Sequence, residues 1–175
     1  MTGGEARAYV GLGSNLGDPP RQIRSALQAL DAPPHTRVVQ RSRLYRTPPW
    51  GVADQPAFVN AVAELATALA PRELLDALLE IERRHGRRRD AARWGPRTLD
   101  LDLLTFADRR VDEPGLVLPH PRLAERAFVL VPLAEIAPDL AIPRVGVVAE
   151  LLERVDASAC VALEGALELD PPRGE

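Results

Sequence analysis

Two aspartates interrupt the hydrophobic segment 93–106, whose sequence is RWGPRTLDLDLLTF. Asp100 and Asp102 are two residues apart, and residues two apart on a β-strand point to the same face of a sheet. The leucines around them then point to the opposite face and can enter a core. Carboxylate oxygens suit Mg²⁺, which usually takes one or two protein carboxylates together with substrate phosphates. The pair is therefore a candidate magnesium site.

The same pair of acids can also be purely structural. On a strand, Asp100 and Asp102 are separated by about 6.6 Å of backbone. At an effective dielectric near 20 the two charges would repel each other by about 2.5 kcal/mol, and in bulk water by about 0.6 kcal/mol. A face exposed to water therefore tolerates both acids, and for an isolated pair we would favour this explanation. The neighbouring residues decide between a magnesium site and a structural pair of acids.

Seven arginines lie between the end of a predicted helix and the aspartate strand. They are Arg83, Arg84, Arg87, Arg88, Arg89, Arg93 and Arg97. The first two complement the dipole at a helix C-terminus, and the others fall in a predicted loop. Such a loop is either a structural ion-pair cluster or a clamp for a polyphosphate whose charge a metal shares. We favour the clamp, because phosphoryl transfer is catalysed mainly by positioning and charge stabilisation.

Aromatic residues make up only 4% of the chain, yet six of the seven adjoin the polar motifs. These six are Tyr45, Trp50, Phe58, Trp94, Phe106 and Phe128. Core packing would explain any one of them. As a group next to Asn60, they are also compatible with a slot that binds a flat heterocycle by stacking and amide hydrogen bonds.

Length and composition predict one globular domain. The chain has 175 residues, of which 46% are hydrophobic, and this is enough for a sizeable core. We expect the domain to span residues 1–165 and residues 166–175 to form a disordered acidic tail. The net charge of −3 disfavours a protein that wraps nucleic acid.

The basic residues exclude some chemistry, because all 22 are arginine. Schiff-base chemistry and the P-loop lysine are therefore ruled out. The single Cys160 cannot form an intrachain disulfide, and no apolar run reaches the ~18 residues of a spanning helix. The start of the chain lacks the pattern of a signal peptide. We expect a soluble, cytoplasmic monomer that binds neither membranes nor nucleic acid.

Strands and helices are predicted to alternate along the chain. The predicted order is strand 6–12, a turn at 13–17, a helix opening at Asp18-Pro-Pro20, strand 36–45, a proline-rich loop, strand 57–65, a helix from Pro71 to Gly86, and strand 98–106. This βαββαβ order is typical of a ferredoxin-like α+β sandwich. Beyond it we predict a hairpin near Val111, a short helix after Pro121 and a helical stretch through 147–155.

The run RWGPRTLDLDLL resembles the signature of the 6-hydroxymethyl-7,8-dihydropterin pyrophosphokinases of folate biosynthesis. Three further blocks agree with this family in order and spacing: YVGLGSNLGD, SRLYRTPPWGVADQPAFVNAV and LVLPHPRLAERAFVLVPLAEIAPDL. The resemblance covers roughly residues 8–155. It implies a ferredoxin-like αβα sandwich with a mainly antiparallel sheet. The implied reaction transfers pyrophosphate from ATP to the hydroxymethyl group of the pterin and releases AMP, with two Mg²⁺ ions.

The resemblance also implies roles for individual residues. Asp100 and Asp102 would hold the metal ions, and together with Arg87 and Arg97 they would form the catalytic set. The implied ATP-binding residues are Arg87, Trp94, Arg97, His120 and Arg126. The implied pterin-binding residues are Thr47, Pro48, Trp50, Phe58, Asn60 and Phe128, with the two phenylalanines stacking on the ring. Phe58 stands where a tyrosine is familiar in the family, which removes a hydroxyl but keeps the stacking face.

Three alternatives compete with this interpretation. Gly11 and Gly13 hint at a dinucleotide-binding loop, but Gly17 falls one residue late for that motif. A ferredoxin-like RNA-binding module would fit the fold and the arginines, yet no strand has the expected aromatic pattern and the chain is acidic. A degenerate structural relative would be expected to have lost an aspartate or a loop arginine, and this chain keeps both acids.

Overall fold

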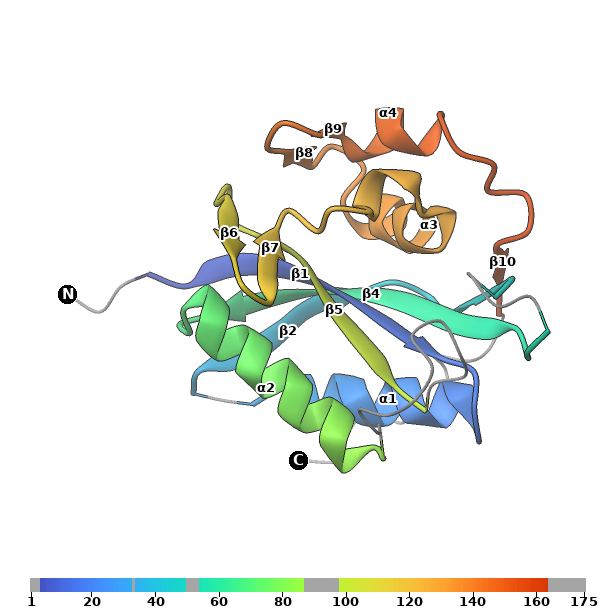
Figure 1. Ribbon diagram of the computed structural model, residues 1–175, viewed down its shortest axis with the longest axis horizontal. Coiled ribbons are helices and arrows are strands. Elements are labelled where there is room, and N and C mark those ends of the chain that lie inside the picture. Colours follow the sequence, from blue (N-terminus) through green and yellow to red (C-terminus); the bar gives the residue numbers. More distant parts are fainter. Residues whose placement is uncertain (1–3, 33, 50–53, 87–97, 164–175) are drawn as a thin grey trace.

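The computed structural model describes residues 4–32, 34–49, 54–86 and 98–163. Figure 1 shows a sheet between two layers of helices. The elements are β1 (Ala6–Ser14), α1 (Pro19–Leu30), β2 (Thr36–Arg41), β3 (Tyr45–Thr47), β4 (Phe58–Thr67), α2 (Pro71–Arg84), β5 (Asp100–Phe106), β6 (Val111–Glu113), β7 (Leu116–Leu118), the 3₁₀ turn η1 (Leu123–Glu125), α3 (Ala127–Ile136), β8 (Ala141–Ile142), β9 (Gly146–Val147), α4 (Val148–Leu152) and β10 (Val161–Ala162).

The main sheet has the strand order β10-β3-β4-β1-β5, and β2 also pairs with β4. Every pairing among the described strands is antiparallel. The predicted ferredoxin-like α+β fold with a mainly antiparallel sheet is thereby confirmed. A dinucleotide-binding unit would need parallel strands joined by a helix, so this topology does not support the dinucleotide-binding alternative.

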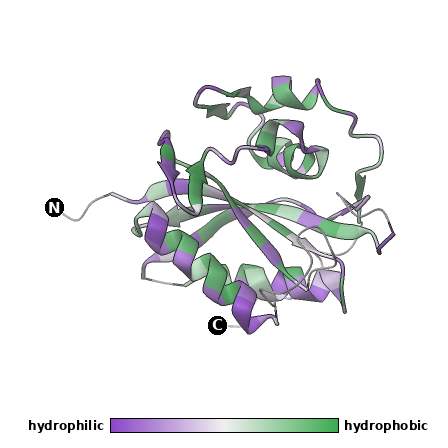
Figure 2. Ribbon diagram, viewed as in Figure 1, coloured by the Kyte–Doolittle hydropathy of each residue, from purple (hydrophilic) through white to green (hydrophobic). Residues whose placement is uncertain are grey.

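The helices cover both faces of the sheet. α1 and α2 lie on one face, and α3 and α4 lie on the other (Figure 1). β4 alternates between the two resulting cores: Val59, Ala61 and Ala63 belong to the core under α1 and α2, and Val62 belongs to the core under α3. Hydrophobic and hydrophilic stretches alternate along α1 and α2, as expected of helices with one buried face (Figure 2).

β1 is longer than the sequence predicted. We expected a turn from Gly13 onward, but Gly13 and Ser14 continue the strand and pair with Asn60 and Val59 of β4. Gly13 also pairs with Asp100 of β5. Partners on both sides extend the strand through a glycine that local propensity assigns to a turn.

The predicted strand 36–45 is divided into β2 and β3. Both parts pair with β4, and the interruption falls at Ser42. The Ser42 N–H donates to the Val62 carbonyl at 2.9 Å, and the Ser42 hydroxyl accepts from the Val62 N–H at 2.9 Å. The side chain therefore replaces a ladder bond where the strand is interrupted.

The helix boundaries follow their capping residues. The Asp18 carboxylate accepts from the Arg21 N–H at the start of α1, and Gly86, with a φ of 84°, follows the end of α2. The short helix predicted after Pro121 is η1. α3 was not predicted, because almost all of its residues are hydrophobic and its sequence shows no amphipathic pattern. α4 covers only the first part of the predicted stretch 147–155.

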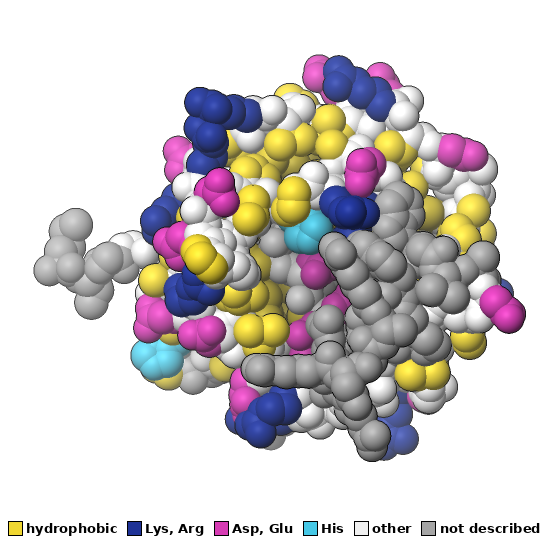
Figure 3. All heavy atoms as spheres, viewed as in Figure 1, with side chains coloured by type: hydrophobic (Ala, Val, Ile, Leu, Met, Phe, Trp, Pro, Cys, Tyr) yellow, Lys and Arg dark blue, Asp and Glu magenta, His cyan; other side chains and the backbone are white. Residues whose placement is uncertain are grey.

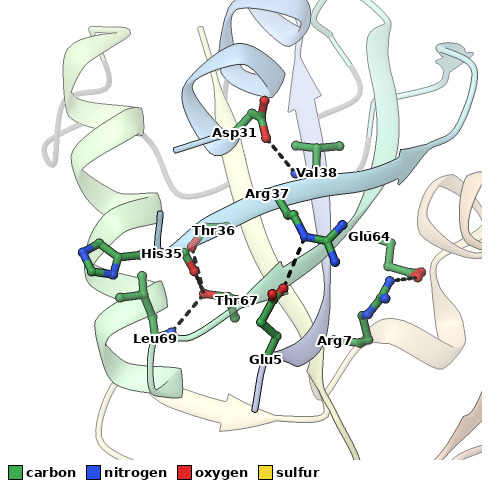
Figure 4. A network of polar contacts seen from close by, with 10 residues as sticks. All are labelled: Glu5, Arg7, Asp31, His35, Thr36, Arg37, Val38, Glu64, Thr67 and Leu69. Carbon is green, nitrogen blue, oxygen red and sulfur yellow. Dashed lines mark hydrogen bonds and ion pairs between the residues drawn. The ribbon is translucent and has the colours of Figure 1, made fainter. Parts of the chain in front are cut away.

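Polar contacts join the strands near one end of the sheet (Figure 4). The Thr36 and Thr67 hydroxyls share a hydrogen bond of 2.8 Å, which links β2 to β4. The ion pair between Arg37 and Glu5 has a distance of 3.3 Å and ties β2 to the residue before β1. These contacts hold the sheet at the end opposite the candidate site. None of the helices in the described ranges has the length and apolarity needed to cross a membrane.

Both tyrosines donate to carboxylates between α3 and the sheet. The Tyr9 hydroxyl donates to Glu64 at 3.1 Å, and the Tyr45 hydroxyl donates to Glu135 of α3. Burial, together with the negative charge of Glu64, raises the pKa of Tyr9 from 10.0 to about 12. Burial and the hydrogen bond to Glu135 likewise raise the pKa of Tyr45. Both tyrosines therefore stay protonated above their ordinary range.

We expect the ultraviolet absorbance of tyrosinate in the native protein to stay flat as pH rises through 10.0, the ordinary pKa of tyrosine. Because the folded-state pKa is raised, the stabilisation from Tyr9 is complete below pH 10.0 and is lost as pH rises toward about 12. The measurement is a spectrophotometric titration of the folded protein, with the chain unfolded in guanidinium chloride as the control. Ionisation of the folded protein at the pH of the unfolded control would contradict this assignment.

Candidate functional site

The two aspartates of β5 lie on the face of the sheet that α3 covers. Leu101 and Leu103 enter the core under α1 and α2, so Asp100 and Asp102 must point the other way. Both acids are partly exposed, and the Asp102 side chain keeps 31% of its surface accessible. Figure 3 shows acidic side chains near the middle of the view, with a histidine and a basic side chain beside them. The predicted shared face of the acids is confirmed by their geometry.

Glu82 anchors the aspartate strand from the opposite side. This glutamate of α2 is only 2% exposed, and its carboxylate accepts from the Leu101 N–H at 2.8 Å. β5 is the last strand of the sheet, so this N–H lies on the outer edge, away from β1. The buried carboxylate therefore fixes the backbone between the two acids. Glu82 was not predicted as a site residue, because in the sequence it is one of several polar residues on a helix.

Arg126 places a buried positive charge beside the acids. It immediately precedes α3 and is 7% exposed, and its Nη1 lies 3.6 Å from Asp102 Oδ2. The Cζ atom of the same guanidinium lies 5.4 Å from the centre of the Phe128 ring. Burial lowers the pKa of Arg126, and the charges of Asp102 and Asp100 act against that effect. Arg126 therefore connects the acids to the aromatic part of the site.

His120 is a neutral side chain next to this cluster. Its backbone N–H donates to the Leu104 carbonyl of β5 at 2.8 Å, which brings the residue to the acidic strand. Burial and the positive charge of Arg126 lower the pKa of His120 from 6.5 to about 4. The Arg122 N–H donates to His120 Nδ1 at 3.2 Å, so the ring proton lies on Nε2. The imidazole therefore offers an N–H donor without a charge.

Strand register brings the acids close to the predicted pterin residues. Asp100 pairs with Gly13, and Gly13 pairs with Asn60, so the three residues form a row across β5, β1 and β4. Directly opposed residues share a face, and two inter-strand spacings separate Asp100 from Asn60 by about 10 Å. The Asn60 Nδ2 donates to the Thr47 hydroxyl at 2.6 Å, and Thr47 is 1% exposed. The predicted metal ligand Asp100 and the predicted pterin ligand Asn60 therefore lie on strands separated only by β1.

Asn15 holds the loop that leads into β4. Its Nδ2 lies 3.0 Å from both Gln55 Oε1 and the Pro56 carbonyl, and the residue is 3% exposed. These bonds tie the end of β1 to the residues just before Phe58. Asn15 was not predicted as a site residue, because its role depends on a loop about 40 residues further along the chain.

Pro48 and Phe128 line one small pocket. The pocket has a volume of about 180 Å³. Its lining consists of Pro48, Pro49, Glu125, Ala127, Phe128, Val155, Asp156, Ala159 and Cys160. It lies where the residues after β3, the start of α3 and the segment after α4 meet. Two of the predicted pterin-binding residues are therefore brought together by elements that are far apart in sequence.

Phe106 and Tyr45 do not contribute to an aromatic slot. Phe58 and Phe128 are partly exposed, whereas Phe106 is 4% exposed and packs in the core under α1 and α2, on the other face from the acids. A bulge in the pairing of β1 with β5 lies between Asp102 and Phe106 and changes which face the later residues occupy. Tyr45 is 5% exposed and its hydroxyl is bonded to Glu135, so it is a structural contact.

Some predicted site residues lie outside the described ranges. Trp50 falls in segment 50–53, and Arg87, Trp94 and Arg97 fall in segment 87–97. The predicted acidic tail, 166–175, also lies outside them. Within the described residues, no group of three or more His, Cys, Asp or Glu side chains is arranged to hold a metal ion. The candidate metal ligands among them are the two aspartates.

Known proteins resemble this chain in sequence. A family model described as 7,8-dihydro-6-hydroxymethylpterin-pyrophosphokinase (HPPK) matches residues 9–138. A Pseudomonas aeruginosa protein named 2-amino-4-hydroxy-6-hydroxymethyldihydropteridine pyrophosphokinase is 52% identical over 160 residues, which cover 91% of this chain and 98% of the relative. A protein of the same name from Methylorubrum extorquens is 50% identical over 158 residues, covering 90% of this chain and 99% of the relative.

The fold is also similar to a solved structure. The crystal structure of wild-type Plasmodium falciparum HPPK-DHPS matches 86% of this chain with a TM-score of 0.66 at 14% sequence identity. The match covers 44% of that longer protein, so this chain spans less than half of its length. At this identity the likeness supports the fold alone.

We expect replacement of Glu82 by methionine to destabilise the protein, because the Leu101 N–H loses its acceptor in a buried position. The loss in unfolding free energy should be about 1–3 kcal/mol. Glu82→Gln keeps a side-chain oxygen of similar reach and should retain more of the stability. Chemical denaturation of both variants measures the difference. Equal losses in the two variants would show that the hydrogen bond to Leu101 is not the source of the stabilisation.

Proposed function

This chain belongs to the 7,8-dihydro-6-hydroxymethylpterin-pyrophosphokinase family, and we propose that it carries out this family's reaction at the cluster between β5, β4 and the start of α3. It transfers pyrophosphate from ATP to the hydroxymethyl group of 6-hydroxymethyl-7,8-dihydropterin in folate biosynthesis, giving AMP and the pterin diphosphate. One observation carries the assignment of the site: the row in which Asp100 and Asn60 flank Gly13. This row supports a site with two halves, a phosphate-binding half on β5 and a pterin-binding half on β4, separated by β1.

The phosphate-binding half is proposed to hold two Mg²⁺ ions with Asp100 and Asp102. The donor set fits, because both carboxylates share a partly exposed face and Mg²⁺ commonly takes only one or two protein carboxylates. The acids already have a cation beside them in Arg126, at 3.6 Å from Asp102. When bound, magnesium would neutralise triphosphate charge and make the pterin hydroxyl easier to deprotonate.

The side chains around the acids are proposed to bind ATP. Arg126 supplies a permanent positive charge, and His120 supplies an uncharged N–H donor, since its pKa of about 4 keeps the ring neutral at physiological pH. The family resemblance assigns charge neutralisation on the triphosphate to Arg87 and Arg97 as well, and closure over both substrates to Trp94. All three residues lie outside the described ranges.

The pterin-binding half is proposed to consist of an amide and stacking surfaces. The Asn60 carboxamide, held by the Thr47 hydroxyl at 2.6 Å, would bond to the polar edge of the ring. Phe58 and Phe128 would stack on its two faces, while Pro48 and Trp50 would line the rim. This arrangement would orient the hydroxymethyl group toward the acids. In-line transfer depends on such positioning, since the protein contributes little covalent chemistry to the step.

The nucleotide product tests the reaction directly. Purified protein incubated with Mg²⁺, ATP and 6-hydroxymethyl-7,8-dihydropterin should form AMP in step with the pterin diphosphate, because both terminal phosphates move together. Chromatography of nucleotides and pterins on the same samples measures the ratio, and omission of the pterin is the control. ADP as the nucleotide product would contradict transfer of two phosphates.

Asp102→Ala should separate catalysis from pterin binding. Loss of the carboxylate removes a proposed metal ligand, so kcat should fall by about a thousandfold or more. The dissociation constant of the pterin should change little, because the ring edge is proposed to bond to Asn60. Steady-state kinetics and calorimetric titration of the pterin measure the two effects. Asp112→Ala, which removes an exposed acid on β6, is the matched control for charge.

Loss of pterin binding in Asp102→Ala would mean that the aspartate shapes the pocket. An unchanged kcat would remove the aspartate from the metal site.

A further inference from the structure

Gly13 lies in the middle of the proposed site but has no side chain to act there. It is buried in β1, between Asp100 of β5 and Asn60 of β4. Glycine is common where the backbone needs a positive φ, and Gly17, Gly86, Gly115 and Gly146 are of this kind. Gly13 is not among the positive-φ glycines of the described chain, and its strand conformation is open to any residue. Its backbone conformation therefore does not require glycine.

The space above Gly13 does require glycine. A Cβ atom at this position would lie 2.7 Å from Asn60 Oδ1 and 3.8 Å from Phe58 Cδ1. The distance to Asn60 Oδ1 is shorter than the normal contact distance between a carbon and an oxygen atom that are not bonded. Either the Asn60 amide or the strand would therefore have to move. Both neighbours are residues that the proposed function assigns to the pterin.

The Asn60 carboxamide has little freedom to move away. The residue is 7% exposed, and its Nδ2 donates to the Thr47 hydroxyl at 2.6 Å. Thr47 is itself 1% exposed. With the nitrogen fixed by this bond, the oxygen is directed over Gly13. A side chain at position 13 would therefore break the bond to Thr47 or push the amide out of its plane.

We propose that Gly13 is a positioning residue for pterin recognition: its missing side chain lets the Asn60 amide lie against β1 in the one orientation fixed by Thr47. This inference rests on the proposed function, in which Asn60 bonds to the pterin edge. The fixed amide presents its oxygen as an acceptor and its second N–H as a donor, which selects a flat ring with complementary groups along one edge. A displaced amide would lose that match.

Gly11 provides a matched control on the same strand. It lies two residues before Gly13, and a Cβ there would lie 3.6 Å from Leu104 Cδ2, an ordinary van der Waals contact. Gly11→Ala and Gly13→Ala thus make the same chemical change on the same face. They differ in whether the new methyl group meets the Asn60 amide.

The test is calorimetric titration of 6-hydroxymethyl-7,8-dihydropterin and of a non-hydrolysable ATP analogue into both variants with Mg²⁺. For Gly13→Ala we expect the Kd of the pterin to rise by about tenfold or more, the effect of losing a well-placed hydrogen bond. The Kd of the ATP analogue should stay within about twofold of the parent value. Gly11→Ala should match the parent for both ligands. Equal weakening of both ligands in Gly13→Ala would overturn the inference.

Two further variants identify the partner of the clash and cover the case in which Gly13→Ala folds poorly. Replacing Asn60 by alanine removes the clashing oxygen, so the Tm of the double variant with Gly13→Ala should exceed that of Gly13→Ala alone. Its pterin affinity should equal that of Asn60→Ala. A double variant with no recovery of Tm would overturn the inference.

Asn60→Ala alone separates this inference from the proposed function. If it binds the pterin as the parent does, the assignment of Asn60 to the pterin is wrong. If it weakens pterin binding while Gly13→Ala does not, the assignment stands and the positioning role of Gly13 is wrong.

Discussion

The alternation of side chains along β5 is the constraint on which the site depends. Leu101 and Leu103 fill the core under α1 and α2, and this burial forces Asp100 and Asp102 onto the opposite face. A slip of one residue in the pairing with β1 would bury both acids and expose the leucines, so the hydrophobic core itself fixes the direction of the carboxylates. The pairing with β1 holds one edge of the strand, and the Glu82 carboxylate holds the other at the Leu101 N–H.

Charge compensation is the second constraint, and it links the site to α3. Arg126 is buried against Asp102, and a buried guanidinium is tolerated only where acids offset the cost of removing it from water. Val129 and Leu130 pack in the core between α3 and the sheet, so the helix carries Arg126 and Phe128 into position together. His120 joins the cluster without adding charge, because burial and Arg126 lower its pKa.

Much of the fold could be predicted because the signals are local. Asp18 and Gly86 mark helix boundaries through bonds and backbone angles within a few residues, and the alternation of leucines and aspartates needs only the strand itself. α3 was missed because almost all of its residues are hydrophobic, so its sequence lacks the alternation of polar and apolar residues that marks an amphipathic helix. The turn predicted at Gly13 was wrong because strand partners from β4 and β5 outweigh the local preference of glycine.

The sequence by itself determined the chemistry: two acids on one face, an arginine-rich segment, an amide near aromatic residues, and the motifs shared with the pyrophosphokinase family. Only the tertiary structure decided which groups meet. The strand order places Asn60 and Asp100 on either side of Gly13, brings the Glu82 carboxylate to the edge of β5, and turns Phe106 away from the site. These contacts join residues about 20 to 90 positions apart, and no local pattern encodes them, because they arise when separate elements pack on the same sheet.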